Sequence, residues 1–130
     1  MSLPDRLKSF ENCLQRFEEV LQKPKDEFIR DSAIKRFELC FELCWKTLKD
    51  FLAREGIICR SPRGCFKEAY SLGLIEDKNE WLLILEDRNL SVHTYSEELA
   101  EELYSHLKGH LNAMKQLLRK LKKRLTFEEF

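Results

Sequence analysis

The chain has 130 residues, of which 35% are charged and 43% are hydrophobic, and its 23 basic side chains balance 23 acidic ones. This length suits one hydrophobic core, so we expect residues 1–130 to form a single domain. Four glycines and three prolines are too few for the many turns of a β-sandwich or barrel. Ordinary apolar content and zero net charge argue against disorder. The composition therefore predicts an all-α fold.

The sequence shows neither a membrane span nor a secretory signal. No apolar run approaches the ~18 residues that a membrane span needs, and the first six residues lack the apolar stretch of a signal peptide. The cysteines are odd in number and form no C-x-x-C pair: Cys13, Cys40, Cys44, Cys59 and Cys65. We interpret them as small hydrophobic side chains in a reducing cytoplasm, rather than as disulfide partners or zinc ligands. We therefore expect a cytoplasmic protein that does not associate with membranes.

The first predicted helix carries a narrow apolar stripe. Ser2, Pro4 and Asp5 are typical of a helix start, and Pro24 ends the pattern. Apolar residues recur between them every three or four positions: Leu3, Leu7, Phe10, Leu14, Phe17 and Leu21. This spacing predicts a helix with one face in the core of a bundle.

The second predicted helix, from about residue 26 to residue 54 with Gly56 after it, is apolar over a wider surface. One stripe consists of Ile34, Phe37, Phe41, Cys44, Leu48 and Phe51, and Leu39, Leu43 and Trp45 broaden it. Such a width indicates a helix at the centre of its bundle or one covered by a second subunit. Glu42 and Lys46 have the order and spacing of a stabilising helical ion pair.

Three further helices are expected after residue 60. Ser61 and Pro62 begin a short helix that Gly73 ends, and Asp77 begins another. Residues 81–85 (Trp-Leu-Leu-Ile-Leu) are apolar on every helical face, so we expect them to be buried nearly all round and, with the wide second helix, to favour a homodimer. After a polar break, a final long helix begins at Thr94 or Ser96 and ends in a basic run. Its expected core stripe is Leu99, Leu103, His106 or Leu107, His110, Met114, Leu117, Leu121 and Leu125. The whole pattern predicts an up-and-down bundle of four-helix type with about five helices.

The polar break contains the residues most suited to chemistry. Arg88 and His93 have an R-x4-H spacing, and Tyr95 follows. In a continuous helix five residues would turn Arg88 and His93 about 140° apart, so a helix break or a second copy of the chain is needed to bring them together. An imidazole can then accept a proton near neutral pH and a guanidinium can bind a phosphate. Such a pair suits transesterification of RNA by its 2′-hydroxyl without a metal. Capping and surface roles for His93 and Tyr95 remain open at this stage.

Two more histidines, His106 and His110, lie one turn apart in the final helix. The segment His-Leu-Lys-Gly-His lacks the glutamate of a zinc protease motif, and no acidic cluster has metal-ligand spacing. We therefore expect no metal or other cofactor, and favour packing or a dimer interface. Gly109 would allow another helix to approach closely.

Several segments together resemble one known family. They are Arg36-Phe37-Glu38, residues 42–48 (Glu-Leu-Cys-Trp-Lys-Thr-Leu), Ser61-Pro62-Arg63, Gly73-Leu74-Ile75, Trp81 and the run from Arg88 to Tyr95. Their order is similar to that of the nucleotidyltransferase substrate-binding family, the HepT-like branch of the HEPN superfamily. The resemblance covers most of the chain.

The resemblance implies a homodimeric toxin subunit that cleaves RNA in a cleft between two R-x4-H motifs. His93 would act as general base or acid, Arg88 would bind the phosphate, and Asn89 would orient the RNA backbone. Tyr95 matches a tyrosine to which a partner of the minimal nucleotidyltransferase type, the antitoxin, attaches AMP, which would obstruct the cleft. Because the net charge is zero, RNA binding would depend on a local cluster of basic residues: Arg60, Arg63, Lys67 and Arg88.

Two other functions fit the same residues. The chain could be a non-catalytic subunit that holds a nucleotide or other substrate for the nucleotidyltransferase, or it could be a dimeric helical scaffold. Loss of RNA cleavage on replacement of His93 would favour the ribonuclease, whereas partner binding that depends only on Tyr95 would favour the binding subunit. The scaffold would be favoured if the motif residues were buried and hydrogen-bonded to one another.

Overall fold

Two long antiparallel helices form two neighbouring sides of the molecule. In the computed structural model, which describes residues 1–128, α1 spans Leu3–Gln22 and α2 spans Glu27–Arg54. Ser2 and Asp26 precede these helices, and each side chain accepts a hydrogen bond from the backbone N–H three residues further on. Both starts agree with the sequence prediction.

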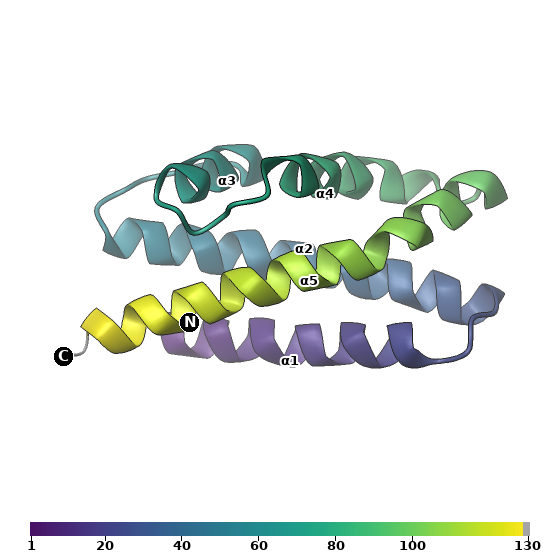
Figure 1. Cartoon of the computed structure of the whole chain (residues 1–130), viewed down its shortest axis with the longest axis horizontal. Helices are drawn as coiled ribbons and strands as arrows, with labels where there is room; N and C mark the ends of the chain where they lie inside the picture. Colours follow the sequence, from purple (N-terminus) through teal and green to yellow (C-terminus); the bar gives the residue numbers. More distant parts are fainter. Residues whose placement is uncertain (129–130) are drawn as a thin grey trace.

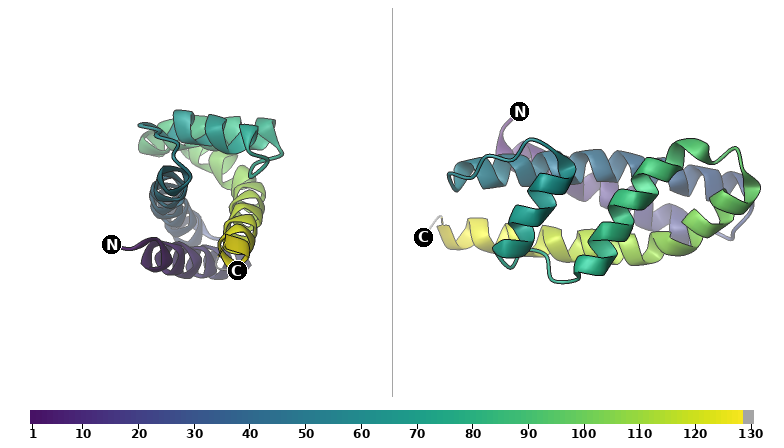
Figure 2. Two further views of the ribbon diagram at one scale, coloured as in Figure 1. Left: turned by 90° about the vertical axis from the view of Figure 1, so that its left-hand side faces the viewer. Right: turned by 90° about the horizontal axis from the view of Figure 1, so that it is seen from above.

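The remaining helices complete a bundle in which the chain runs alternately up and down. They are α3 (Pro62–Ser71), α4 (Lys78–Leu90), the single 3₁₀ turn η1 (Ser91–His93) and α5 (Glu97–Glu128). α1, α2 and α5 make three sides, and α3 with α4 makes the fourth (Figures 1 and 2). Within residues 1–128 there is no strand. The predicted all-α, up-and-down bundle is therefore confirmed.

The core contains the predicted stripes of the long helices. Leu7, Phe10, Leu14 and Phe17 of α1 are buried, while Leu3 and Leu21 at its ends are half-buried. α5 buries every fourth or third residue, including Leu103, Leu107, His110, Met114, Leu117 and Leu121. None of the described helices has the length and apolar character needed to cross a membrane.

The burial of α4 differs from the prediction. Trp81 and Ile84 are buried, but Leu82 is 42% exposed and Leu83 and Leu85 are half-buried. α4 packs against α3, η1 and α5, so these neighbours leave one of its faces uncovered in a single chain. The expectation that residues 81–85 are buried nearly all round is therefore wrong for the isolated chain. Leu39 of α2 is similarly exposed, at 41%.

The cysteine prediction was wrong for one pair. Cys59, in the connection between α2 and α3, forms a disulfide with Cys65 of α3, and their Cα atoms are 5.2 Å apart. The two residues are six positions apart, and their C-x5-C spacing matches no common motif. Cysteine content therefore gives no support for a reducing compartment. Cys40 and Cys44 are buried free thiols and Cys13 is a half-buried one, as expected for small hydrophobic side chains.

Candidate active site at the break between α4 and α5

The expected break in the helix pattern is present, and it separates the candidate residues. Arg88 and Asn89 lie in the last turn of α4, His93 ends η1, and Tyr95 lies in the turn that precedes α5. Arg88 is partly buried, whereas Asn89 and His93 are exposed and Tyr95 is 84% exposed. The break thus presents one anchored cation and three accessible polar side chains.

Two carboxylates of α2 position the guanidinium of Arg88. Its Nη1 lies 3.6 Å from Glu38 Oε2, and its Nη2 lies 3.7 Å from Glu42 Oε1. The guanidinium also lies 5.9 Å from the centre of the Phe41 ring, a cation–π contact. Three side chains on one face of α2 therefore hold the guanidinium of Arg88 in place.

The hydroxyl of Ser91 completes this anchor. It lies 2.8 Å from the carbonyl oxygen of Arg88 and 3.1 Å from Glu38 Oε2, and it accepts a long hydrogen bond of 3.4 Å from Arg88 Nη1. Ser91 is buried, and the sequence analysis did not single it out. Its position three residues after Arg88, at the helix end, was the available signal.

The guanidinium keeps hydrogen-bond donors for a ligand. Arginine has five N–H groups, and the 3.4 Å contact with Ser91 is the single hydrogen bond that Arg88 donates within residues 1–128. Its Nε is buried without a partner. The carboxylates of Glu38 and Glu42 lie farther away than in a good hydrogen bond. The outer N–H groups of the guanidinium could therefore bind a phosphate while Glu38 and Glu42 hold the side chain in place.

His93 and Tyr95 form a second, exposed pair. The Tyr95 hydroxyl lies 3.5 Å from Nδ1 of His93, and the two rings meet edge to face with centres 5.9 Å apart. Because both side chains are open to solvent, the imidazole can exchange protons with a bound molecule and the phenol can be reached by another protein. A bulky group attached to the Tyr95 hydroxyl would lie directly beside the His93 ring.

In the described part of one chain, no hydrogen bond or ion pair joins Arg88 to His93. The break brings His93 to Tyr95, while Arg88 turns toward α2. A ligand, or the same motif of a second chain, would have to connect the two groups.

A groove with a basic rim lies between α3 and α4. Its volume is about 520 Å³, and it is lined by Arg63, Phe66, Lys67, Tyr70, Ser71, Ile75, Lys78, Trp81, Leu82 and Leu85. The Phe41 ring that contacts Arg88 also meets Phe66 edge to face, with ring centres 5.9 Å apart. Lysine and arginine beside aromatic rings suit a phosphate backbone with bases that stack. Of the expected basic cluster, Arg63 and Lys67 lie on this rim.

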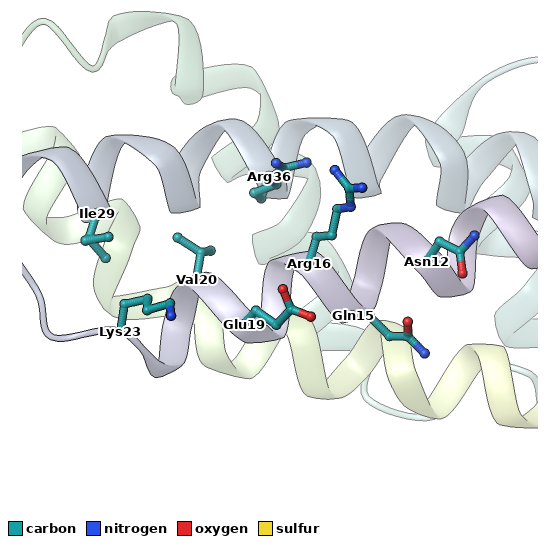
Figure 3. Close-up of a pocket in the computed structure, with 8 residues that line it drawn as sticks. All are labelled: Asn12, Gln15, Arg16, Glu19, Val20, Lys23, Ile29 and Arg36. Atoms are coloured by element: carbon teal, nitrogen blue, oxygen red, sulfur yellow. The ribbon is translucent and has the colours of Figure 1, made fainter.

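A larger hollow of about 600 Å³ lies elsewhere, along α1 and α2 (Figure 3). Its lining is mainly polar, with Arg16, Glu19, Lys23 and Arg36 among its residues. None of the predicted site residues contributes to it. Size alone therefore does not identify the functional site in this molecule.

The two histidines of α5 contact carboxylates of α4 in the same chain. His110 is fully buried, and its two ring nitrogens contact Glu80 Oε1 at 2.8 Å and Asp87 Oδ2 at 2.6 Å. His106 Nδ1 lies 2.9 Å from the same oxygen of Asp87. Gly109 makes room for the side chain of Glu80 of the same chain, since a Cβ there would lie 2.7 Å from Glu80 Oε1. The predicted packing role is therefore confirmed, and the close neighbour of Gly109 is a side chain of α4. The sequence analysis missed Glu80 and Asp87 as partners of these histidines.

The sequence of the chain is similar to those of known proteins. The family model described as "Nucleotidyltransferase substrate binding protein like" matches residues 5–123. A Haemophilus influenzae protein described as "Probable ribonuclease HepT" is 33% identical over 73 residues. That match covers 52% of this chain and spans about half of the relative, 50% of its length.

Two solved structures share the bundle. A protein from Thermus thermophilus superposes with a TM-score of 0.82 at 35% identity, over 86% of this chain and 98% of that one. A Haemophilus influenzae structure, described as revealing the fold of a substrate binding domain of a nucleotidyltransferase, gives a TM-score of 0.69 at 25% identity. It covers 92% of this chain and 96% of its own.

Proposed function

Since the chain belongs to the nucleotidyltransferase substrate binding protein-like family, we propose that it is the toxin subunit of a HEPN-type pair, a metal-independent endoribonuclease held in check by a partner nucleotidyltransferase. The observation that carries this proposal is the helix break, which presents an exposed imidazole and, five residues earlier in the sequence, an anchored guanidinium with free donors. The relative described as a probable ribonuclease HepT supports it.

The reaction that suits these groups is transesterification. His93 accepts the proton of a ribose 2′-hydroxyl, the 2′-oxygen bonds to the adjacent phosphorus, and the bond from phosphorus to the 5′-oxygen breaks. Arg88 stabilises the added negative charge on the phosphoryl oxygens, and Asn89 orients the backbone. The 5′-oxygen leaves with a proton from an imidazolium or from water. The products are a 2′,3′-cyclic phosphate and a 5′-hydroxyl, and no metal takes part.

Because Arg88 and His93 do not meet within one chain, we propose that a homodimer completes the cleft. The uncovered apolar positions of α2 and α4, Leu39 and Leu82, supply surface for such contact. Light scattering at micromolar concentration should give twice the chain mass, and Leu82→Glu should shift it toward the monomer. A wild-type monomer under these conditions would contradict the dimer.

Regulation by AMP transfer would act at Tyr95. The Tyr95 hydroxyl loses its proton to water, its oxygen bonds to the α-phosphorus of ATP bound to the partner, the bond from that phosphorus to pyrophosphate breaks, and the tyrosine carries AMP beside His93. The added phosphate would repel RNA and the nucleoside would obstruct the imidazole. With the partner and ATP, mass spectrometry should detect AMP on the wild type and none on Tyr95→Phe, which should still cleave RNA after the incubation.

The decisive experiment is RNA cleavage by the purified chain in EDTA. We expect wild-type protein to cut an oligoribonucleotide and to leave unchanged the same oligonucleotide with deoxyribose at the cleaved position. His93→Gln should abolish cleavage while circular dichroism shows the same helix content. Intact RNA at high wild-type concentration would refute the proposal.

A second function is favoured by the Haemophilus structure described as a substrate binding domain. In that case the chain holds a nucleotide or other substrate for the partner and catalyses nothing itself. Three results would support this binding subunit. The partner would bind only when Tyr95 is present, RNA would remain uncut, and cells that express the wild type or Arg88→Gln would grow equally well.

A further inference from the structure

Three potential metal ligands converge where α4 meets α5. They are Asp87, in the last turns of α4, and His106 and His110, one turn apart on α5. One ligand atom from each of the three lies within 4.8 Å of the others. Asp87 and His110 are buried, at 3% and 0% exposure, and the side chain of His106 is 27% exposed. The cluster therefore has a closed floor and one accessible side.

The buried charges of this cluster lack a conventional partner. In the described chain, neither Asp87 nor Glu80 forms an ion pair with a lysine or an arginine; the histidines are their partners. A buried carboxylate needs a compensating positive charge, because desolvation disfavours its ionised form. A bound cation would supply the positive charge that the carboxylates of this cluster lack.

The hydrogen-bond count leads to the same result. Carboxylates face both ring nitrogens of His110, Glu80 at 2.8 Å from Nδ1 and Asp87 at 2.6 Å from Nε2. A neutral imidazole has one N–H and cannot donate to both. One contact therefore lacks a donor unless an additional proton or a metal ion lies between the two groups.

We propose that Asp87, His106 and His110 bind a divalent transition metal of the zinc type. Two imidazoles and one carboxylate are a common ligand set for zinc, with a fourth position left for water. His110 would bind the metal through Nε2 and donate Nδ1–H to Glu80, the carboxylate–histidine pairing that orients metal ligands in many proteins. Gly109 is required for this arrangement because it leaves space for the Glu80 carboxylate.

The geometry needs only a small adjustment. Ligand distances of about 2.0–2.1 Å place tetrahedral neighbours about 3.3 Å apart. The separations from Asp87 Oδ2 are now 2.6 Å to His110 Nε2 and 2.9 Å to His106 Nδ1. The first therefore has to lengthen by roughly 0.7 Å and the second by roughly 0.4 Å. The His106 ring, 27% exposed, can make the second movement and provides a path from solvent, whereas the first needs a small shift between the buried side chains of Asp87 and His110.

The metal would join two helices next to the candidate active site. Asp87 immediately precedes Arg88, so a metal there would fix the end of α4 relative to α5. Its role is structural, since no reacting group contacts it. This proposal is independent of the ribonuclease proposal.

The test is titration of the metal-depleted chain with zinc sulfate by calorimetry. We expect one zinc per chain, with binding weakened about ten-fold or more in His106→Gln. His93→Gln is the matched control, because His93 is the one histidine outside the cluster, and it should bind like the wild type. Zinc should raise the melting temperature of the wild type and of His93→Gln, but not that of His106→Gln.

Cobalt distinguishes the cluster from the cysteines. Tetrahedral cobalt bound by nitrogen and oxygen gives visible bands, whereas thiolate ligands such as Cys13 would add a strong near-ultraviolet band. Visible bands that Asp87→Asn removes would support the proposal. Absence of saturable zinc binding, equal binding by wild type and His106→Gln, or a thiolate band would overturn it.

Discussion

Glu38 Oε2 lies 3.6 Å from Nη1 of Arg88, so a carboxylate near the middle of α2 positions the guanidinium at the end of α4. The same oxygen is 3.1 Å from the Ser91 hydroxyl, the first residue after the helix. Glu38 therefore contacts both sides of the point where α4 ends. It holds the cation in place without saturating its N–H groups.

Glu38→Gln should lower the kcat of RNA cleavage about ten-fold, which corresponds to about 1.4 kcal/mol of transition-state stabilisation. The amide keeps the size of the side chain but removes the charge that orients Arg88. Steady-state kinetics on one oligoribonucleotide would measure the change.

Glu86→Gln is the matched control for this experiment. Glu86 is an exposed acidic residue of α4 that has no ion pair or side-chain hydrogen bond in the region described. Its replacement should leave kcat unchanged. An equal loss in both variants would show that general charge, rather than the position of Arg88, determines the rate.

Reduction of the Cys59–Cys65 disulfide should lower the free energy of unfolding by about 2 kcal/mol, because the bond closes a short loop in the unfolded chain. Urea unfolding followed by circular dichroism, with and without dithiothreitol, would measure this difference. In the double variant Cys59→Ala/Cys65→Ala the reductant should have no effect. A reductant effect that persists there would instead implicate Cys13 or Cys40, whose sulfur atoms lie 2.9 Å apart.

The long helices were predictable because their signals are local. Ser2 and Asp26 bond to N–H groups three residues away, and the stripe of α1 depends only on helical period. The order and type of all five helices followed from such patterns.

The contacts that define the candidate site were not predictable in the same way. Glu38 and Ser91 meet only because η1, at the end of α4, lies against α2, and Asp87 meets His110 only because α4 packs on α5. Residue spacing along the chain does not predict these contacts between helices. For Leu82 the sequence predicted more burial than the single chain provides. An apolar run indicates burial, but it does not show whether the residues that bury it belong to the same chain.

Acid should weaken the contact between the start of α2 and the start of α5. Arg30, 3% exposed, donates hydrogen bonds to Glu97 and Glu101, and this lowers the pKa of Glu97. Lys25, and then Arg30, likewise lower the pKa of Glu101. A carboxylate with a lowered folded-state pKa stabilises the fold above its unfolded pKa, and that stability is lost as the pH falls through the folded pKa.

The free energy of unfolding should therefore decrease as the pH falls below about 4.5, the ordinary pKa of these carboxyls. Arg30→Met should be less stable at pH 7 and should lose less on acidification, because its Glu97 then titrates nearly as in the unfolded chain. Urea unfolding at a series of pH values would measure both slopes. Lys46→Met, which removes an exposed lysine far from this cluster in the sequence, should keep the wild-type slope.

Gly109→Ala should fail to stabilise the protein, although alanine ordinarily favours a helix by up to about 1 kcal/mol over glycine. The added Cβ would lie 2.7 Å from Glu80 Oε1, so the Glu80 side chain has to move and its contact with buried His110 is lost. In the background of Glu80→Ala the obstacle is gone, and there Gly109→Ala should raise the free energy of unfolding by the ordinary amount. Urea unfolding of the four proteins in this double-mutant cycle gives the coupling energy between the two positions. Equal effects of Gly109→Ala in both backgrounds would mean that Gly109 has no part in seating Glu80 against His110.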